Sequence, residues 1–133
     1  PKPPTFTYLY SSNVTLGPTI DYGAGPRGHR VAIPITGGTL SGPRIKGNFI
    51  NLGADWGAID NLGVFNPDTR YGILTDDGAN IYIQTSGPTQ KDGHTHLRMI
   101  FETAANSTYS WLNEIVAVGI LTGGSGYVSI DAW

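Results

Sequence analysis

Short apolar segments that alternate with polar residues run through the middle of the chain, from residue 37 to residue 83. Two acidic turns interrupt them, Gly53-Ala54-Asp55-Trp56-Gly57 and Thr75-Asp76-Asp77-Gly78. Asp-Gly between two such segments is the strongest short-range signal for a β-hairpin, and alternation with period two is typical of strands. The pattern therefore predicts an antiparallel sheet with carboxylates at the ends of its strands.

Similar segments extend over most of the chain, and about nine strands are expected, beginning with a pair at residues 5–10 and 14–20. Nineteen glycines and nine prolines without a period fit many short strands and tight turns. The connections are too short for helical crossovers, and closure into a barrel leaves no sheet edge exposed. We therefore predict an all-β, antiparallel, closed, lipocalin-like β-barrel with one short helical turn at residues 107–113, formed by a single domain over residues 1–133.

Charge and composition argue against several classes of function. The net charge is −2, and the eight basic residues form no cluster that could bind a phosphate backbone. No apolar run approaches the roughly 18 residues that span a bilayer. The chain has no cysteine, no phosphate loop, no dinucleotide fingerprint and no Gly-x-Ser-x-Gly elbow. We therefore expect no nucleic-acid partner, no membrane insertion and no cofactor.

Two tripeptides, Asn13-Val14-Thr15 and Asn106-Ser107-Thr108, match the acceptor pattern for N-glycosylation. The first residue is Pro1 rather than Met, as in a mature chain without its signal peptide. Trimming of the chain explains this start equally well, and such tripeptides also arise by chance. The pattern favours a secreted glycoprotein of the secretory pathway as a working hypothesis.

The segment from His94 to Glu102 has the clearest alternation in the chain. Leu97, Met99 and Phe101 fall on one face, and the opposite face is unusually polar, so it is either solvated or lines a pocket. His94 and His96 project to one side and could ligate a metal with Glu102 as a third ligand. The cupin pattern is matched only in part, because it needs a further histidine downstream and none follows His96. We therefore expect no metal.

Several short motifs occur in an order and spacing that resemble a known family. They are Gly25–Arg30, Pro34–Thr39, Gly42–Arg44, Gly53–Trp56, Arg70–Tyr71, Thr75–Gly78, Ile81–Tyr82, Phe101–Thr103 and Tyr109–Asn113. The chain resembles the domain of unknown function 3237 (DUF3237) family over roughly residues 25–121. The resemblance implies a compact β-barrel with an interior cavity. Some members resemble tailoring enzymes of fungal aromatic polyketide pathways, which guide ring closure without a cofactor.

Four charged residues are candidates for catalysis. Asp55 could be shielded by its neighbour Trp56, so that its raised pKa lets it hold a proton, although a turn-making role explains an Asp beside Gly equally well. Arg98 and Glu102 lie on one strand face and could flank a ligand or form a surface ion pair. Arg44, within a motif of the family, could stabilise negative charge on oxygen.

Four aromatic residues are candidates for binding the substrate. Trp56, Tyr109 and Trp111 could stack on a planar ligand, and Tyr82 could donate a hydrogen bond to it. Packing within the barrel is the alternative for all four.

We interpret the chain as a cofactor-free cyclase or isomerase of secondary metabolism. It would assist intramolecular ring closure of an aromatic polyketide-like substrate by acid/base chemistry, for example by adding a hydroxyl to an alkene. The alternatives are a non-catalytic carrier that binds a hydrophobic aromatic molecule in the barrel, and a structural or interaction protein whose barrel is filled with side chains. The sequence is compatible with a monomer and with a homo-oligomer.

Overall fold

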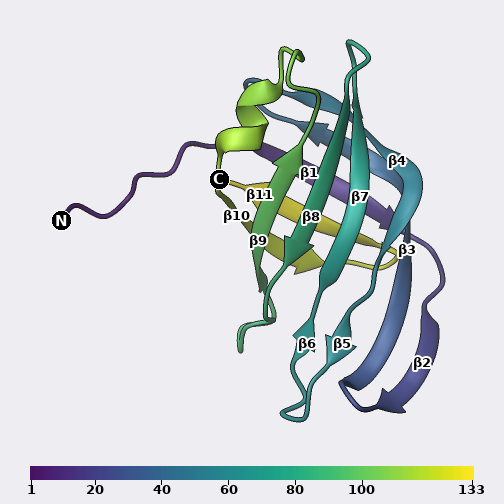
Figure 1. Ribbon diagram of the computed structural model, residues 1–133. Helices are drawn as coiled ribbons and strands as arrows, with labels where there is room; N and C mark the ends of the chain where they lie inside the picture. Colours follow the sequence, from purple (N-terminus) through teal and green to yellow (C-terminus); the bar gives the residue numbers. More distant parts are fainter.

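Eight strands close into an antiparallel barrel in the computed structural model, which describes residues 1–133 (Figure 1). Strand β3 pairs with β1 and closes the circle. The barrel strands, in the order in which they pair, are β1 (Tyr10–Leu16), β11 (Tyr127–Ala132), β10 (Ala117–Gly123), β9 (Thr95–Glu102), β8 (Asn80–Ser86), β7 (Asp68–Thr75), β4 (Lys46–Asp55) and β3 (Gly28–Ser41).

Three further strands form an extension beyond one end of the barrel (Figure 1). They are β2 (Ile20–Gly25), β5 (Ala58–Ile59) and β6 (Phe65–Asn66). The first part of the 14-residue strand β3 pairs with β2 and β5, and β6 pairs with β5. Because β3 belongs to both parts, the extension continues the wall of the barrel.

A bulge in β4 distorts the wall next to β7. The register of this pair shifts between Phe49 and Gly53, so the residues between them have no partner on β7. Gly53 has φ +107, and a Cβ atom there would lie 2.2 Å from the carbonyl oxygen of Arg70. Only glycine fits this close approach of two strands.

The interior of the barrel is filled with apolar side chains, as the alternation of the strands requires. On β9, Leu97, Met99 and Phe101 are buried while Arg98 and Glu102 are exposed, which confirms the predicted pattern of this strand. The largest fully buried apolar side chains come from four strands, β1, β7, β8 and β9, and from the helical turn: Tyr10, Val14, Ile73, Ile81, Ile83, Leu97, Met99 and Leu112.

A short 3-10 helix, η1 (Ser110–Glu114), covers the end of the barrel opposite the extension (Figure 1). Its Leu112 is fully buried and belongs to the core cluster. The helix begins three residues later than predicted, and the hydroxyl of Ser107 accepts a hydrogen bond from the amide of Tyr109, 3.1 Å away, in the preceding turn.

The closed antiparallel barrel confirms the predicted fold class, with eleven strands where about nine were expected. The predicted strand at residues 5–10 is wrong, because β1 begins only at Tyr10. Of residues 5–9, only Leu9 donates a backbone hydrogen bond, to the carbonyl oxygen of Ala132. No helix of the structure is both long and apolar enough to cross a membrane. Asn13 and Asn106 are exposed, and their glycosylation and the secretory location stay predictions.

Candidate functional site

A cavity of about 100 Å³ lies inside the barrel at the end next to the extension. Its wall is mostly apolar, with five residues that carry polar side chains: Asp55, Thr69, Tyr71, Thr85 and Thr95. Half-buried apolar residues form its mouth: Leu16, Ile33, Phe65, Leu121 and Val128. The barrel is therefore packed at the η1 end and hollow at the other.

Asp55, the last residue of β4, is an acidic group in an apolar wall. Its Oδ1 accepts a hydrogen bond from the amide of Asp68 at 2.9 Å. Burial raises the pKa of Asp55 to about 6; the amides of Asp68 and Gly57 oppose this rise, and the negative charge of Asp68 adds to it. The carboxyl group is therefore protonated in about half of the molecules near pH 6 and in about a tenth of them at pH 7.

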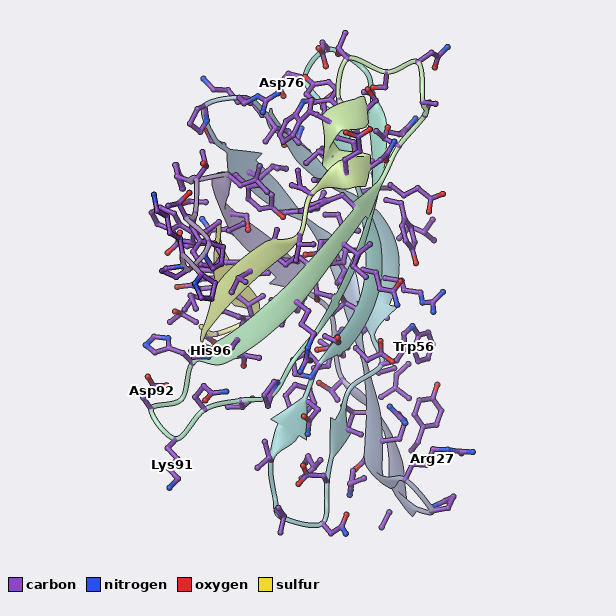
Figure 2. The ribbon with its side chains drawn as sticks, turned by 60° about the vertical axis from the view of Figure 1, so that its left-hand side comes forward. Arg27, Trp56, Asp76, Lys91, Asp92 and His96 are labelled. Carbon is purple, nitrogen blue, oxygen red and sulfur yellow. The ribbon has the colours of Figure 1, made fainter.

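Phe65 on β6, and not Trp56, shields this carboxyl group. Asp55 faces the cavity, and the next residue, Trp56, is 46% exposed on the outside, where Figure 2 shows it at the edge of the molecule. A Cβ atom at Gly57 would lie 2.5 Å from the Phe65 ring and 3.0 Å from Oδ1 of Asp55. Glycine at this position thus lets the ring cover the carboxyl group. The predicted shielding by Trp56 is wrong, because Trp56 follows the end of β4 and its side chain is exposed.

Tyr71 on β7 places a second polar group at the cavity. Its hydroxyl is buried and has no hydrogen-bond partner, and its ring packs against Phe49 with centroids 5.4 Å apart. Burial, with a further contribution from the charge of Asp55, raises the pKa of Tyr71 well above its ordinary value. The hydroxyl therefore stays protonated and is free to donate a hydrogen bond to a ligand.

The sequence analysis did not assign Tyr71 to the site, although a signal was present. Thr69, Tyr71, Ile73 and Thr75 follow one another at every second position of β7, and all four are buried. Reading this alternation as an inward face would have placed Tyr71 inside the barrel.

Three threonines complete the polar part of the cavity. The hydroxyls of Thr69 and Thr85 are 2.6 Å apart, and the amide of Thr85 donates to the hydroxyl of Thr69 at 3.1 Å. The hydroxyl of Thr95 lies 3.1 Å from that of Thr89. These hydroxyl groups are already engaged within the chain, so Tyr71 and the unbonded side of Asp55 are the groups left for a ligand.

Arg44, Trp111 and Tyr109 lie at the η1 end of the barrel, away from Asp55. The guanidinium carbon of Arg44 is 3.7 Å from the centre of the Trp111 ring, a cation–π contact. The hydroxyl of Tyr109 donates to the carboxylate of Asp77 at 2.9 Å. Hydrogen bonds from the hydroxyl of Thr75 and then from that of Tyr109 lower the pKa of Asp77.

Arg98, Glu102 and Tyr82 lie on the outer face of the sheet. All three are exposed, and Tyr82 and Glu102 border a surface hollow on the other side of the wall from the cavity. The expectation that Arg44, Asp55, Arg98 and Glu102 meet in one cavity is therefore wrong. Of the eight candidates from the sequence, Asp55 alone lines the interior cavity.

The two histidines at the start of β9 lie outside the barrel. Nδ1 of His94 is 3.1 Å from the hydroxyl of Thr122, and His96 is exposed at the edge of the molecule in Figure 2. No group of three or more His, Cys, Asp or Glu side chains is close enough to hold a metal ion.

A family model described as "Protein of unknown function (DUF3237)" matches residues 4–98. The chain belongs to this family. The match and the resemblance seen in the motifs overlap over residues 25–98.

Relatives of this DUF3237 chain include an enzyme. This chain is 31% identical over 125 residues to the hydroalkoxylation enzyme phnH of Penicillium herquei, and the comparison covers 90% of this chain and 75% of that protein. A crystal structure of a β-barrel-like protein from Acinetobacter baumannii is similar with a TM-score of 0.92 and 38% identity, covering 99% of this chain and 96% of that one. An enzyme from Penicillium herquei has a TM-score of 0.81 and 28% identity, covering 100% and 97%.

The cavity of this DUF3237 chain is suited to proton transfer. A carboxyl group with a pKa of about 6 can give or take a proton at neutral pH, and an apolar wall strengthens its interaction with a charge that forms nearby. The neutral hydroxyl of Tyr71 can orient an oxygen of the ligand. Together they supply acid/base chemistry and positioning.

Proposed function

We propose that this chain is a cofactor-free cyclase of secondary metabolism that closes an oxygen-containing ring by adding a hydroxyl group to an alkene of the same molecule. The observation that carries the proposal is the carboxyl group of Asp55, raised to a pKa of about 6 in an apolar cavity that also holds the free hydroxyl of Tyr71. The kinship with a hydroalkoxylation enzyme supports this class of reaction.

Asp55 would both donate and recover the proton. In its acid form it protonates one alkene carbon, and positive charge develops on the other carbon. The substrate hydroxyl attacks that carbon, forms the C–O bond and returns its proton to the carboxylate, so no atom or electron is gained or lost overall. The apolar wall favours the neutral acid before the reaction, and the carboxylate then stabilises the positive charge beside it.

The size of the cavity indicates which part of the substrate enters it. Ligand pockets usually measure roughly 300–1,000 Å³. A cavity of about 100 Å³ holds only a small branched chain such as the alkene-bearing group. The aromatic part would then rest on the apolar mouth formed by Leu16, Phe65 and Val128, with its reacting hydroxyl near Tyr71.

The experiment that tests this proposal compares the wild type with Asp55→Asn on a phenol that carries an ortho-prenyl chain. Asparagine keeps the shape and accepts the hydrogen bond from Asp68 but cannot deliver a proton. We expect turnover to fall about 100-fold or more, the usual contribution of general acid catalysis, while substrate affinity changes little. Product formation and its enantiomeric excess are measured by chiral chromatography, and affinity by calorimetry.

Asp76→Asn is the matched control, because Asp76 is exposed at the β7–β8 turn at the opposite end of the barrel (Figure 2). It should leave turnover unchanged. If Asp55→Asn keeps full turnover, the carboxyl group is not the acid. If the wild type binds the phenol but never converts it, the chain is a carrier rather than a cyclase.

A further inference from the structure

The outer face of the sheet formed by β4, β7, β8 and β9 bears a hollow of about 580 Å³, separate from the interior cavity. Residues of all four strands line it. Those that matter here are Ile50, Leu52, Arg70, Gly72, Tyr82 and Glu102.

The hollow lies beside a ridge. The bulge in β4 carries Ile50 and Leu52, and Leu52 is 74% exposed. Gly72 on the neighbouring strand has no side chain, and the position of its missing Cβ atom is 3.3 Å from Cδ1 of Ile50. A surface with a ridge next to a hollow can match a second copy of itself, because a two-fold axis brings each ridge to the partner's hollow.

This face also exposes several large apolar side chains to solvent. Besides Leu52, the exposed residues Ile100, Leu74 and Tyr82 lie on it, on three adjacent strands. Continuous exposed apolar patches of this kind mark interaction sites in soluble proteins.

Two opposite charges flank the patch without a partner of their own. Strand register places Gly72, Tyr82 and Glu102 in one row across the sheet, and Arg70, Gln84 and Ile100 in the next. Arg70 and Glu102 thus lie diagonally across β8, on β7 and β9. The single ion pair of the chain joins Asp21 and His29 elsewhere, so both Arg70 and Glu102 are free to pair across an interface.

We propose that the chain forms a homodimer through this face, in which Arg70 of each copy pairs with the partner's Glu102. A two-fold axis in the plane of the sheet, passing over β8 between Tyr82 and Gln84, exchanges the positions of Arg70 and Glu102. It creates the ion pair twice and brings the two Tyr82 rings together at the centre. The interior cavity opens at the end of the barrel and stays accessible in this dimer, and the inference does not depend on the proposed reaction.

Charge reversal tests the pairing. We expect the wild type to sediment with twice the 14.2 kDa mass of the chain. Its dissociation is measured by analytical ultracentrifugation at roughly 1 to 200 µM, the range in which the weaker interfaces of standard size dissociate. Arg70→Glu and Glu102→Arg should each yield monomers at concentrations at which the wild type is dimeric. The double variant Arg70→Glu with Glu102→Arg should restore the dimer, because the pair is remade with reversed signs.

Two control reversals, Lys91→Glu and Glu114→Arg, change exposed charges away from the hollow and should leave the dimer intact; Figure 2 shows Lys91 projecting from the β8–β9 turn. Circular dichroism checks that each variant is folded. A wild type that stays monomeric, or a dimer that the single reversals leave unchanged, overturns the proposal. So does a double variant that stays monomeric. A monomer whose Tyr82 ring signals shift on addition of the prenylated phenol would assign the hollow to a small ligand and likewise overturn it.

Discussion

At the scale of single residues, Asp55 and Tyr71 are polar groups whose burial lowers the stability of the fold. Asp55 has only part of its hydrogen-bonding capacity satisfied by the chain, and the hydroxyl of Tyr71 has none. An unsatisfied buried hydroxyl costs roughly 1–3 kcal/mol. Such groups are typical of sites at which a ligand completes the hydrogen bonding.

Tyr71→Phe tests this reading, because it removes only the hydroxyl. We expect the free energy of unfolding to rise by about 1 kcal/mol, since the unpartnered group is gone. Turnover of the prenylated phenol should fall about 10-fold, since one hydrogen bond to the reacting oxygen is lost. Chemical denaturation and steady-state kinetics measure the two effects. A variant that is destabilised and fully active would show that the hydroxyl has a structural role.

Tyr10 has the same kind of orphan hydroxyl deeper in the barrel. Its pKa is raised first by burial and then by the neighbouring Tyr71. Tyr10→Phe is the matched comparison for Tyr71→Phe. It should stabilise the fold in the same way but leave turnover unchanged, because Tyr10 does not line the cavity.

At the scale of elements, the extension built on β3 sets the environment of Asp55. Strand β6 supplies Phe65, and the segment between β4 and β5 supplies Gly57, whose missing side chain admits the Phe65 ring. The raised pKa of Asp55 therefore depends on β6 and on the segment between β4 and β5, neither of which belongs to the main core cluster.

Gly57→Ala should displace the Phe65 ring, because the new methyl group would lie 2.5 Å from two ring carbons. We expect a loss of about 1–3 kcal/mol in stability, as for other overpacked sites, and a pKa of Asp55 closer to its ordinary value as water enters. Gly123→Ala is the control, since no heavy atom lies within 4 Å of its missing Cβ atom. Thermal unfolding and NMR titration report the two effects. An unchanged pKa in Gly57→Ala would show that Phe65 does not shield the carboxyl group.

Local patterns predicted the individual strands well but not the assembly of the site. The alternation in β9 placed Leu97, Met99 and Phe101 on one face but did not decide which face points inward, and Asp77-Gly78 marked the turn between β7 and β8. Which strands meet around a cavity depends on long-range register, and the shift between Phe49 and Gly53 changes that register without a clear mark in the sequence. Arg98 and Glu102 lie elsewhere because they are on the outward face of β9, and Arg44 lies beside Trp111 at the other end of the barrel from Asp55.

At the scale of the whole molecule, the two ends of the barrel have different tasks. Leu112 of η1 fills the end away from the extension, where the core is tightly packed. The other end is left open, with Asp55 and Tyr71 at the cavity. This division separates the residues that stabilise the fold from those proposed to react.

Leu112→Ala tests this separation. Removing a fully buried leucine should lower the free energy of unfolding by about 2–5 kcal/mol. Turnover well below the melting temperature should stay within twofold of the wild type, because the cavity lies at the opposite end. Differential scanning calorimetry and kinetics at a low temperature give both values. A large loss of turnover in folded protein would show that the two ends are coupled.

The central claim is that the protonated carboxyl group of Asp55 starts ring closure, and one pair of titrations tests it most directly. The carboxyl carbon of Asp55 is followed by carbon-13 NMR in the free protein, and kcat/KM for the prenylated phenol is measured over the same pH range. Because the acid form reacts, kcat/KM should be highest at low pH and fall as pH rises through the pKa of Asp55, so both midpoints should lie at about 6. A carboxyl carbon that titrates near the ordinary value of Asp, or a kcat/KM that does not change through pH 6, would contradict the account.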